Sequence, residues 1–391
     1  MNVQQHFIEP LDVLVLRGNK LFGDPGSFGE SVVPPWPSVA AGALRSALLA
    51  RKGISPSLFA AGAHHDFELG TPEHPGSFVL TAFNLARRWH DSPAQAEPLQ
   101  PLPADLILCK QDDGRLVAEK LHPHQLHRGI RCSSATPALA VLSEKERRKP
   151  ETGHWLTVTG WKKHIAGKSI DADADLVRSA ELWRVDLRVG VGLERQSRRA
   201  ADGALFSTEA VALRKAEHQP VTSRRYDIGF LAETVGVEIP DDLPLRFGGD
   251  GRVALCRSVS VEPAVPDYDA IAAAGRCRLV LTAPGIFRDG WLPTGATDTN
   301  NEITFDLHGV RGRLVCAAVR RAQTVSGFDL ARQRPKPAQR VAPIGSVYWL
   351  DDVHATPEAL RKLVAEGLWS DLPEDASRRA EGFNRLILAN Y

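Results

Sequence analysis

The chain has 391 residues, of which 43% are hydrophobic and 24% are charged. This composition excludes a disordered or fibrous protein, and the length suits about two or three domains with cores of their own. Lysine and arginine number 48 against 47 aspartates and glutamates, so the net charge of +1 leaves any nucleic-acid surface to local basic clusters. The five cysteines are widely spaced and form no C-x-x-C, which argues against a disulfide framework or a zinc ribbon. Without a signal-peptide pattern or an apolar run of membrane length, we expect a cytoplasmic protein.

The first predicted elements are a buried strand at 12–17 and a helix that follows the proline-rich stretch PPWP. Ser38 is the expected N-cap of this helix, and small alanines follow it. A rigid helix start with little side chain over it can bind an anion, and Arg45 lies on the same helix. The alternative is an ordinary tight turn into a packed helix.

Downstream, the pattern predicts a strand at 77–83 and a hairpin over 106–121 that turns at Asp113-Gly114. Residues 135–169 resemble an insertion that projects from a domain, with Lys162 and Lys163 near its end. A helix is expected at 171–180. Alternating apolar residues from Trp183 to Val191 then predict a half-buried strand.

The second half predicts strands at 252–261, 276–283, 311–319 and 345–350. A helix over 356–368 begins with Thr356 as N-cap and Pro357 at its first position, and a strand closes the chain. The first half follows the order of a ferredoxin-like unit, which is also the core of RNA-recognition modules. We therefore expect an α+β protein with two ferredoxin-like domains, 1–215 with its insertion and 216–391.

Catalytic and metal-binding motifs find little support. GWKKHIAGKS ends like a phosphate-binding loop, but Lys162 stands where that loop needs a glycine. His122, His124 and His127 are close together, yet no carboxylate lies near them, so they are interpreted as surface or turn histidines. We expect no catalytic residues, no metal and no cofactor.

Basic clustering is the strongest functional signal. Residues 311–340 contain eight arginines and lysines and one acid, Asp329. Gly327 offers a backbone N–H, Phe328 offers a stacking ring, and guanidinium groups suit phosphate. The candidate RNA-binding residues of this segment are Gly327, Phe328, Arg332, Arg334, Lys336 and Arg340. The alternative is a solvated basic loop.

Two further loops fit the same chemistry. Arg195, Arg198 and Arg199 follow the alternating strand directly. A glycine turn with Gly248, Gly249 and Arg252 would allow a nucleic-acid backbone to approach closely. Each loop alone is a weak signal, because glycine turns after strands are common.

Five segments resemble one family, in order from residue 7 to about 350: FIEPLDVLVLRG, ESVVPPWPSVAAGALRSAL, VGVGLERQSRRAADGALFST, FGGDGRVAL and RPKPAQRVAPIGSVYWL. They are similar to the RAMP subunit of type III-B CRISPR effectors (Cmr complexes) that caps the 5′ end of the guide RNA. The resemblance implies tandem RNA-recognition-like (RAMP) domains without a catalytic centre. It also implies three partners: the 5′ tag of the guide RNA (crRNA), the large polymerase-like subunit and the backbone RAMP subunit. Ser38 and Arg45 would then lie beside the RNA.

Two alternatives remain open. A RAMP endoribonuclease that processes precursor guide RNA shares the fold and also carries histidines. A scaffold that contacts only protein would need none of the basic loops for RNA.

Overall fold

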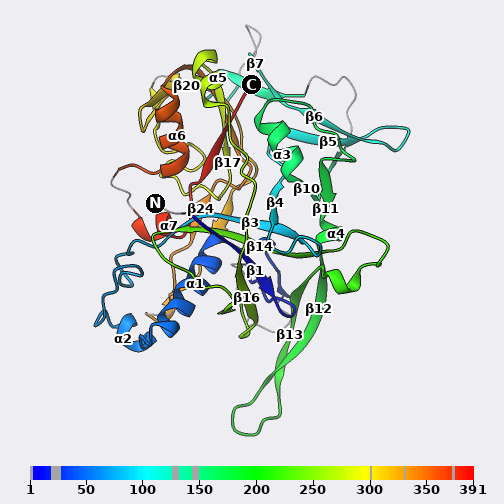
Figure 1. The fold of residues 1–391 in the computed structure, drawn as a ribbon, viewed down its shortest axis with the longest axis vertical. Helices are drawn as coiled ribbons and strands as arrows, with labels where there is room; N and C mark the ends of the chain where they lie inside the picture. Colours follow the sequence, from blue (N-terminus) through cyan, green and yellow to red (C-terminus); the bar gives the residue numbers. More distant parts are fainter. Residues whose placement is uncertain are drawn as a thin grey trace. The chain divides into compact units, whose positions relative to one another are not determined.

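The computed structural model describes residues 3–18, 28–125, 132–142, 149–299, 302–329, 332–371 and 375–391. The chain forms two compact units that are interleaved in the sequence. Unit 1 comprises Met1–Pro98, Ala180–Val261 and Val325–Ala338, and unit 2 comprises Leu99–Ser179, Glu262–Thr324 and Gln339–Tyr391. This division differs from the single boundary near residue 215 that the sequence suggested. Helices combine with mostly antiparallel sheets, so the fold is α+β (Figure 1).

The main sheet of unit 1 is antiparallel and places its first strand near the centre. Its order is β3 (Val79–Trp89), β14 (Tyr226–Val235), β1 (Gln4–Pro10), β16 (Val253–Ser258) and β15 (Leu243–Arg246). Helix α1 (Pro37–Arg51) connects β1 to β3 and packs against β3 and β15. The order β3-β14-β1-β16 is that of a ferredoxin-like sheet. The link from β14 to β16 runs through β15 rather than through the second helix of that motif.

Residue spacing explains why α1 packs as it does. Ala40, Ala41, Leu44 and Leu48 recur at helical intervals and are all buried. Beyond the helix, the ring of Phe230 lies 5.4 Å from that of Phe83 and 5.3 Å from that of Phe247, measured between centroids. These side chains form much of the core of unit 1.

A long hairpin of unit 1 is formed by β12 (Trp183–Leu193) and β13 (Ala200–Leu213), drawn in green in Figure 1. Among the described residues, its small sheet contains one further strand, β2 (Phe28–Gly29). The alternating side chains of β12 are therefore exposed by 44–67% and not half-buried as predicted. Alternation shows which side chains share a face, but it does not show whether another layer covers that face. The exposed residues are Val185, Leu187, Val189, Val191 and Leu193, and we call them the apolar stripe.

Unit 2 contains a sheet of order β18 (Ala296–Thr299), β19 (Glu302–Leu307), β20 (Val310–Ala318), β25 (Val347–His354), β17 (Cys277–Leu281) and β26 (Leu386–Ala389). Neighbouring strands are antiparallel. Helices α6 (Pro357–Glu366) and α7 (Ala376–Ala380) connect β25 to β26. The order β20-β25-β17-β26 is again ferredoxin-like, but a loop and β18–β19 replace the first crossover helix. The strand orders support two ferredoxin-like domains, which stay a prediction.

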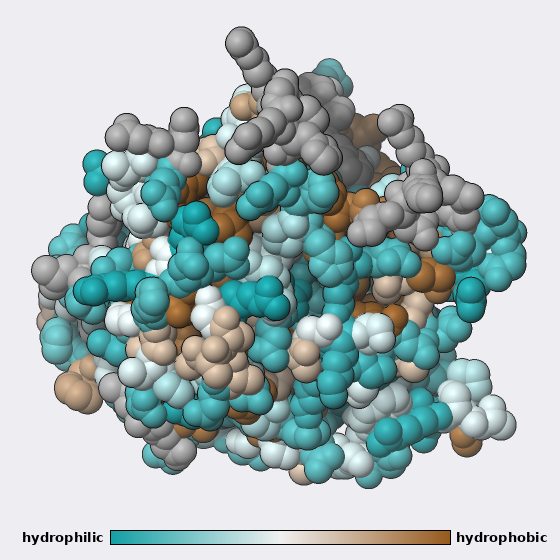
Figure 2. All heavy atoms as spheres, turned by 90° about the horizontal axis from the view of Figure 1, so that it is seen from above, coloured by the Kyte–Doolittle hydropathy of each residue, from teal (hydrophilic) through white to brown (hydrophobic). Residues whose placement is uncertain are grey.

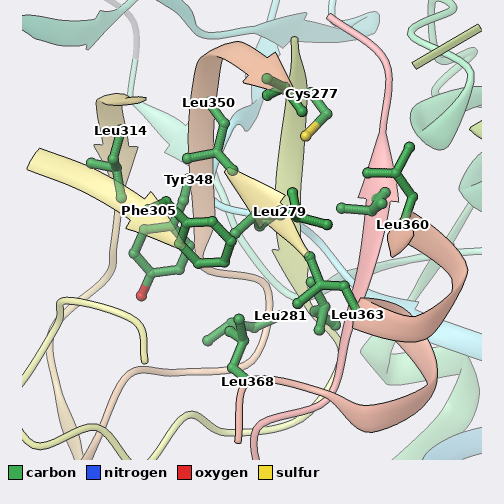
Figure 3. Close-up of a cluster of buried hydrophobic side chains, with 14 of the residues drawn as sticks. Cys277, Leu279, Leu281, Phe305, Leu314, Tyr348, Leu350, Leu360, Leu363 and Leu368 are labelled. Carbon is green, nitrogen blue, oxygen red and sulfur yellow. The ribbon is translucent and has the colours of Figure 1, made fainter. Parts of the chain in front are cut away.

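Both faces of this sheet are covered. One face places Leu279 and Tyr348 against Leu360 and Leu363 of α6 (Figure 3). The other face packs against α3 (Val158–Ile165) and β5 (Leu106–Lys110). Burial on both faces explains why most residues of β17 and the first four of β25 are apolar.

The second core corrects the prediction of a projecting insertion at 135–169. Leu156, Trp161 and Ile165 are buried members of that core, because they lie on β10 (His154–Leu156) and on one face of α3. The insertion was also expected to carry a charged tip with Lys145, Arg147 and Arg148, and these residues lie outside the described ones, as does His127.

The remaining elements are short. In unit 2 these are β6 (Leu116–Lys120), β7 (His122–Gln125), β8 (Ala138–Val141), β9 (Pro150–Glu151), β11 (Leu176–Arg178), α5 (Tyr268–Ala274) and β24 (Gln339–Val341). In unit 1 they are α2 (Pro56–Ala60), η1 (Ala216–His218), β22 (Phe328–Asp329) and β23 (Arg334–Pro335). Three elements have residues in both units, namely β4 (Ala96–Pro101), α4 (Ser179–Leu182) and β21 (Gln323–Val325).

Two local predictions are wrong for identifiable reasons. Residues 12–17 form no strand, although Leu14 is buried and exchanges both backbone hydrogen bonds with Val211 at 2.8 Å. Residues 171–180 are not a helix, because the Asp171 carboxylate accepts the backbone N–H groups of the next turn, at 3.0 Å for Asp173. Aspartate favours such turns over a helix interior. The 106–121 hairpin and the Thr356 N-cap are confirmed.

Candidate nucleic-acid interface

The three arginines after β12 lie at the tip of the long hairpin. Arg195, Arg198 and Arg199, called the tip arginines below, are exposed. The turn is closed by hydrogen bonds of 2.9 Å in which Arg198 N–H donates to Glu194 O and Glu194 N–H donates to Arg199 O. Within the described part of the chain, no carboxylate pairs with their side chains. Three guanidinium groups on one exposed turn can therefore bind phosphate.

The 311–340 segment is less basic in the fold than in the sequence. Arg311 pairs with Asp306 at 3.0 Å and Arg313 with Asp352 at 3.0 Å. Arg332 pairs with Glu73 at 2.7 Å and with Asp329 at 3.1 Å. Acids near the segment, together with Glu73 and Asp352 from elsewhere in the chain, thus neutralise part of the cluster. Arg321, Arg334 and Arg340 are exposed and have no ion pair with another described residue.

A small hairpin carries the aromatic candidate of this segment. The Phe328 side chain is 53% exposed, and Phe328 lies opposite Pro335 in the β22–β23 ladder. Gly327 has φ of 145° and accepts a 2.8 Å hydrogen bond from the Lys336 N–H. Because Arg334 faces Asp329 in the next register position, the ring and the arginine point to opposite faces of the hairpin.

The start of α1 differs from the prediction. Trp36 is the N-cap and Pro37 takes the first helical position, so Ser38 is already inside the helix. The fixed φ of proline and its missing N–H suit that position better than a serine does. Arg45 donates to Leu69 O at 2.6 Å, so its guanidinium contacts its own unit.

The glycine turn at 247–252 approaches its own chain. Gly249 N–H donates to Val15 O at 2.8 Å, and a Cβ at Gly248 would lie 2.9 Å from that oxygen. Arg252 pairs with Asp12 at 2.5 Å. The close approach that glycine allows here serves packing within unit 1.

The two α3 lysines are also paired. Lys162 lies 2.5 Å from Glu262, and Lys163 lies 2.7 Å from the buried carboxylate of Asp175. Both contacts are within unit 2. The Lys162–Glu262 pair is largely exposed and contributes little to stability, whereas Lys163 pairs with a buried acid.

Unit 2 also contains a buried ionic network of Asp105, His164 and Arg278, each at most 3% exposed. His164 Nε2 lies 2.9 Å from Asp105 Oδ1, and Arg278 donates to Asp105 and, at 2.7 Å, to His164 O. Burial alone would raise the pKa of Asp105, but the His164 and Arg278 contacts hold it well below its usual range. Burial lowers the pKa of His164. Because these groups are enclosed, loss of one of them would leave its partners buried without compensation.

A cavity of about 680 Å³ lies within unit 2. Trp291, Arg320 and Arg340 line it together with the hydroxyl groups of Ser134 and Thr136. The sequence analysis selected Arg340 but missed Trp291, because a tryptophan in a Gly-Pro-rich turn looks the same in sequence whether it is buried or exposed. Figure 2 shows one face of the molecule, on which apolar residues form small patches between hydrophilic ones.

The comparisons with known proteins identify the family. Residues 6–390 match the family model described as CRISPR-associated protein (Cas_Cmr3). The chain belongs to the Cas_Cmr3 family. The resemblance found in the sequence to the Cmr subunit of type III-B effectors is thereby confirmed.

Other comparisons with this Cas_Cmr3 member are more distant. Comparison with curated proteins gives no match. A chain of a type III-B Cmr-β complex bound to cognate target RNA and AMPPnP is similar at 12% identity and a TM-score of 0.46, with 98% of each chain covered. A second type III-B Cmr-β structure, bound to cognate target RNA, matches at 12% identity and a TM-score of 0.42, over 88% of this chain and 86% of that one.

Further site types find no support in the part of this Cas_Cmr3 chain that the structure describes. Among those residues, no group of three or more histidines, cysteines, aspartates or glutamates could hold a metal ion. None of the helices described there is long and apolar enough to cross a membrane.

Proposed function

We propose that the chain is a non-catalytic subunit of a type III-B CRISPR effector that binds the 5′ tag of the guide RNA. The observation that carries the proposal is the Cas_Cmr3 match, which extends over both units, from residue 6 to residue 390. The family is a structural part of the Cmr complex, and this chain shares that role.

The exposed basic groups support RNA as the ligand. Proteins hold single-stranded RNA with positive groups along the backbone and with aromatic side chains under the bases. The tip arginines, Arg334 and Arg340 have no carboxylate partner among the described residues, and the ring of Phe328 is more than half exposed. These positions are the strongest candidates. The ion-paired Arg252, Arg332, Lys162 and Lys163 are weaker ones.

The apolar stripe on β12 supports assembly with other subunits. Its five large side chains are continuous along one hairpin face and open to solvent. Contiguous apolar surface of this kind marks an interaction site. Docking to the large polymerase-like subunit and to the backbone RAMP subunit therefore belongs to the proposal.

The test is a nuclease footprint of the guide RNA in an effector reconstituted with and without this chain. We expect the 5′ tag to be protected only when the chain is present. Replacing all three tip arginines with glutamine should weaken that protection, and replacing Arg311, which is already paired with Asp306, should not. Equal exposure of the tag with and without the chain would leave a scaffold that contacts only protein.

A cleavage assay separates the remaining alternative. The chain alone, incubated with repeat RNA without metal, should leave the RNA intact. Sequence-specific cutting would favour a RAMP endoribonuclease that processes precursor guide RNA.

A further inference from the structure

The cavity in unit 2 has the size and lining of a site for one nucleotide. Its volume of about 680 Å³ lies within the range of small-molecule sites, about 300–1,000 Å³. Its lining combines an aromatic ring, two guanidinium groups, hydroxyl groups and the carboxylate of Asp289. A phosphate alone would interact only with the two guanidinium groups. A base also offers N–H groups, which can donate hydrogen bonds to the carboxylate of Asp289.

The loop that carries Trp291 is fixed from several sides. Tyr348, buried in the core shown in Figure 3, donates its hydroxyl to Trp291 O at 2.7 Å. Earlier in the loop, Gly285 and Ala342 exchange backbone hydrogen bonds of 2.9 and 2.8 Å. The Asn384 side chain accepts a hydrogen bond from the Ile286 N–H and donates one to Ile286 O. The indole, which is 36% exposed, is therefore presented by a rigid turn, and a ligand loses little entropy in ordering it.

The two guanidinium groups come from different parts of unit 2. Arg340 lies on β24, is exposed, and pairs with no carboxylate among the described residues. Arg320 follows β20 and donates to Pro103 O at 3.3 Å. Arg320 is exposed, so its guanidinium group is accessible to an anionic ligand in the cavity.

We propose that this cavity binds one unstacked nucleotide of single-stranded RNA, with its base on Trp291 and its phosphate on Arg340. The inference rests on the proposed function, because the guide RNA is the polymer that supplies the nucleotide. The hydroxyl groups of Ser134 and Thr136 lie 2.9 Å apart, and Thr136 donates to Ala138 O at 2.9 Å. They can therefore still accept a hydrogen bond from the base edge or the 2′-hydroxyl. The cavity would distinguish one base from another, whereas the tip arginines would contact phosphate, which carries no sequence information.

A second cavity, of about 470 Å³, at the base of the long hairpin is a weaker candidate. Its lining includes Lys215 and His218. Lys215 is paired with Glu9 at 3.2 Å, and His218 lies 3.7 Å from Glu217. Arg184 and Arg214 also line this cavity, but its lining has no hydroxyl group or carboxylate that could bind the edge of a base.

The experiment removes one base at a time from the RNA. Single-stranded RNA with the tag sequence is prepared with an abasic nucleotide at each position in turn. Binding to the full chain is measured alone and within the reconstituted effector. We expect one position at which the missing base weakens binding about 5- to 150-fold, the range for loss of one stacked base.

Variants link that position to the cavity. Trp291→Ala should weaken binding of intact RNA by a similar factor and should abolish the effect of the abasic nucleotide at that position. Trp291→Phe, which keeps a ring, should restore most of the affinity. Arg340→Ala should weaken binding of every RNA alike and flatten the salt dependence by about 0.7, as one lost phosphate contact requires. Arg321→Ala is the matched control, since Arg321 is exposed and outside the cavity lining, and it should leave the abasic profile unchanged.

The outcomes separate this inference from the proposed function. If Trp291→Ala leaves RNA affinity and the abasic profile unchanged while the tag stays protected, the cavity assignment is wrong and the function stands. If the wild-type effector leaves the tag unprotected, the function itself fails. If Trp291→Ala instead reduces co-purification with a neighbouring subunit at unchanged RNA affinity, the cavity receives protein and the inference is overturned.

Discussion

Replacing Arg278 with methionine removes the permanent charge from the buried ionic network of unit 2. Arg278 donates to the Asp105 carboxylate, to His164 O at 2.7 Å and to Asn390 O at 3.0 Å. Methionine fills a similar volume but donates nothing. Among the described residues, Asp105, 1% exposed, would then keep only His164 as a hydrogen-bonding side-chain partner. The carbonyl groups of His164 and Asn390 would each lose a donor.

Removing one member of a buried ion pair costs about 3–5 kcal/mol, because the other charge stays buried without compensation. We expect a loss of this size in the free energy of unfolding, measured by urea denaturation of the full chain. Arg311→Met is the matched control: Arg311 and Asp306 form a pair that is largely exposed on both sides, and such pairs contribute about 0–1 kcal/mol.

A double variant tests the reason for the loss. Changing Asp105 to leucine together with Arg278→Met removes the stranded charge and should recover part of the lost stability. The reasoning is refuted if Arg278→Met destabilises the chain no more than Arg311→Met does.

Further predictions concern other parts of the chain. Glutamine at all three tip arginines should flatten the salt dependence of RNA binding by about 2, measured as the slope of log K against log salt. Gly248→Ala should lower the free energy of unfolding by more than Gly251→Ala, because both have positive φ but only Gly248 would place a Cβ against Val15 O. Val189→Thr should change that free energy by less than about 0.5 kcal/mol yet reduce effector assembly, since Val189 is 67% exposed. Burial lowers the pKa of His6 from 6.5 to about 4. Between these two pH values His6 is protonated in the unfolded chain but not in the folded one, so the free energy of unfolding should fall by about 3 kcal/mol from pH 6.5 to pH 4. His6→Gln should flatten that acid limb of the stability curve.

Local signals in the sequence predicted the elements whose own residues determine them. The turn at Asp113-Gly114 and the cap at Thr356 depend on chemistry within a few residues, and both are confirmed. Residues 12–17 were misassigned because their apolar pattern reports burial, and a segment can be buried without pairing along a ladder. The predicted half-burial of β12 was wrong for a related reason. No property of β12 itself tells whether another layer covers it.

The candidate site shows the same limit. The basic segment 311–340 could be found because its charge is local, but two of the acids that neutralise it lie far away in the sequence. Glu73 pairs with Arg332 across more than 250 residues, and Asp352 pairs with Arg313 from the neighbouring strand β25. Similarly, the glycine turn at Gly248 indicated a close backbone approach, and the structure shows that the approaching backbone is Val15 of the same chain. The sequence thus shows which residues are charged or can approach a backbone closely, whereas the fold shows which groups they contact.

The interleaved course of the chain has a consequence for synthesis. Strand β1 leaves the ribosome first, yet both of its neighbours, β14 and β16, begin more than two hundred residues later. At about 5–20 residues per second, that delay is on the order of 10–45 s. During this time Phe7 and Ile8, which are buried in the folded chain, have no neighbouring strand to pack beside. Unit 2 likewise needs β26, at the end of the chain, to complete its sheet. Both sheets therefore stay incomplete until their last strands have been synthesised, and chaperone capacity, more than final stability, should limit the yield of the folded protein.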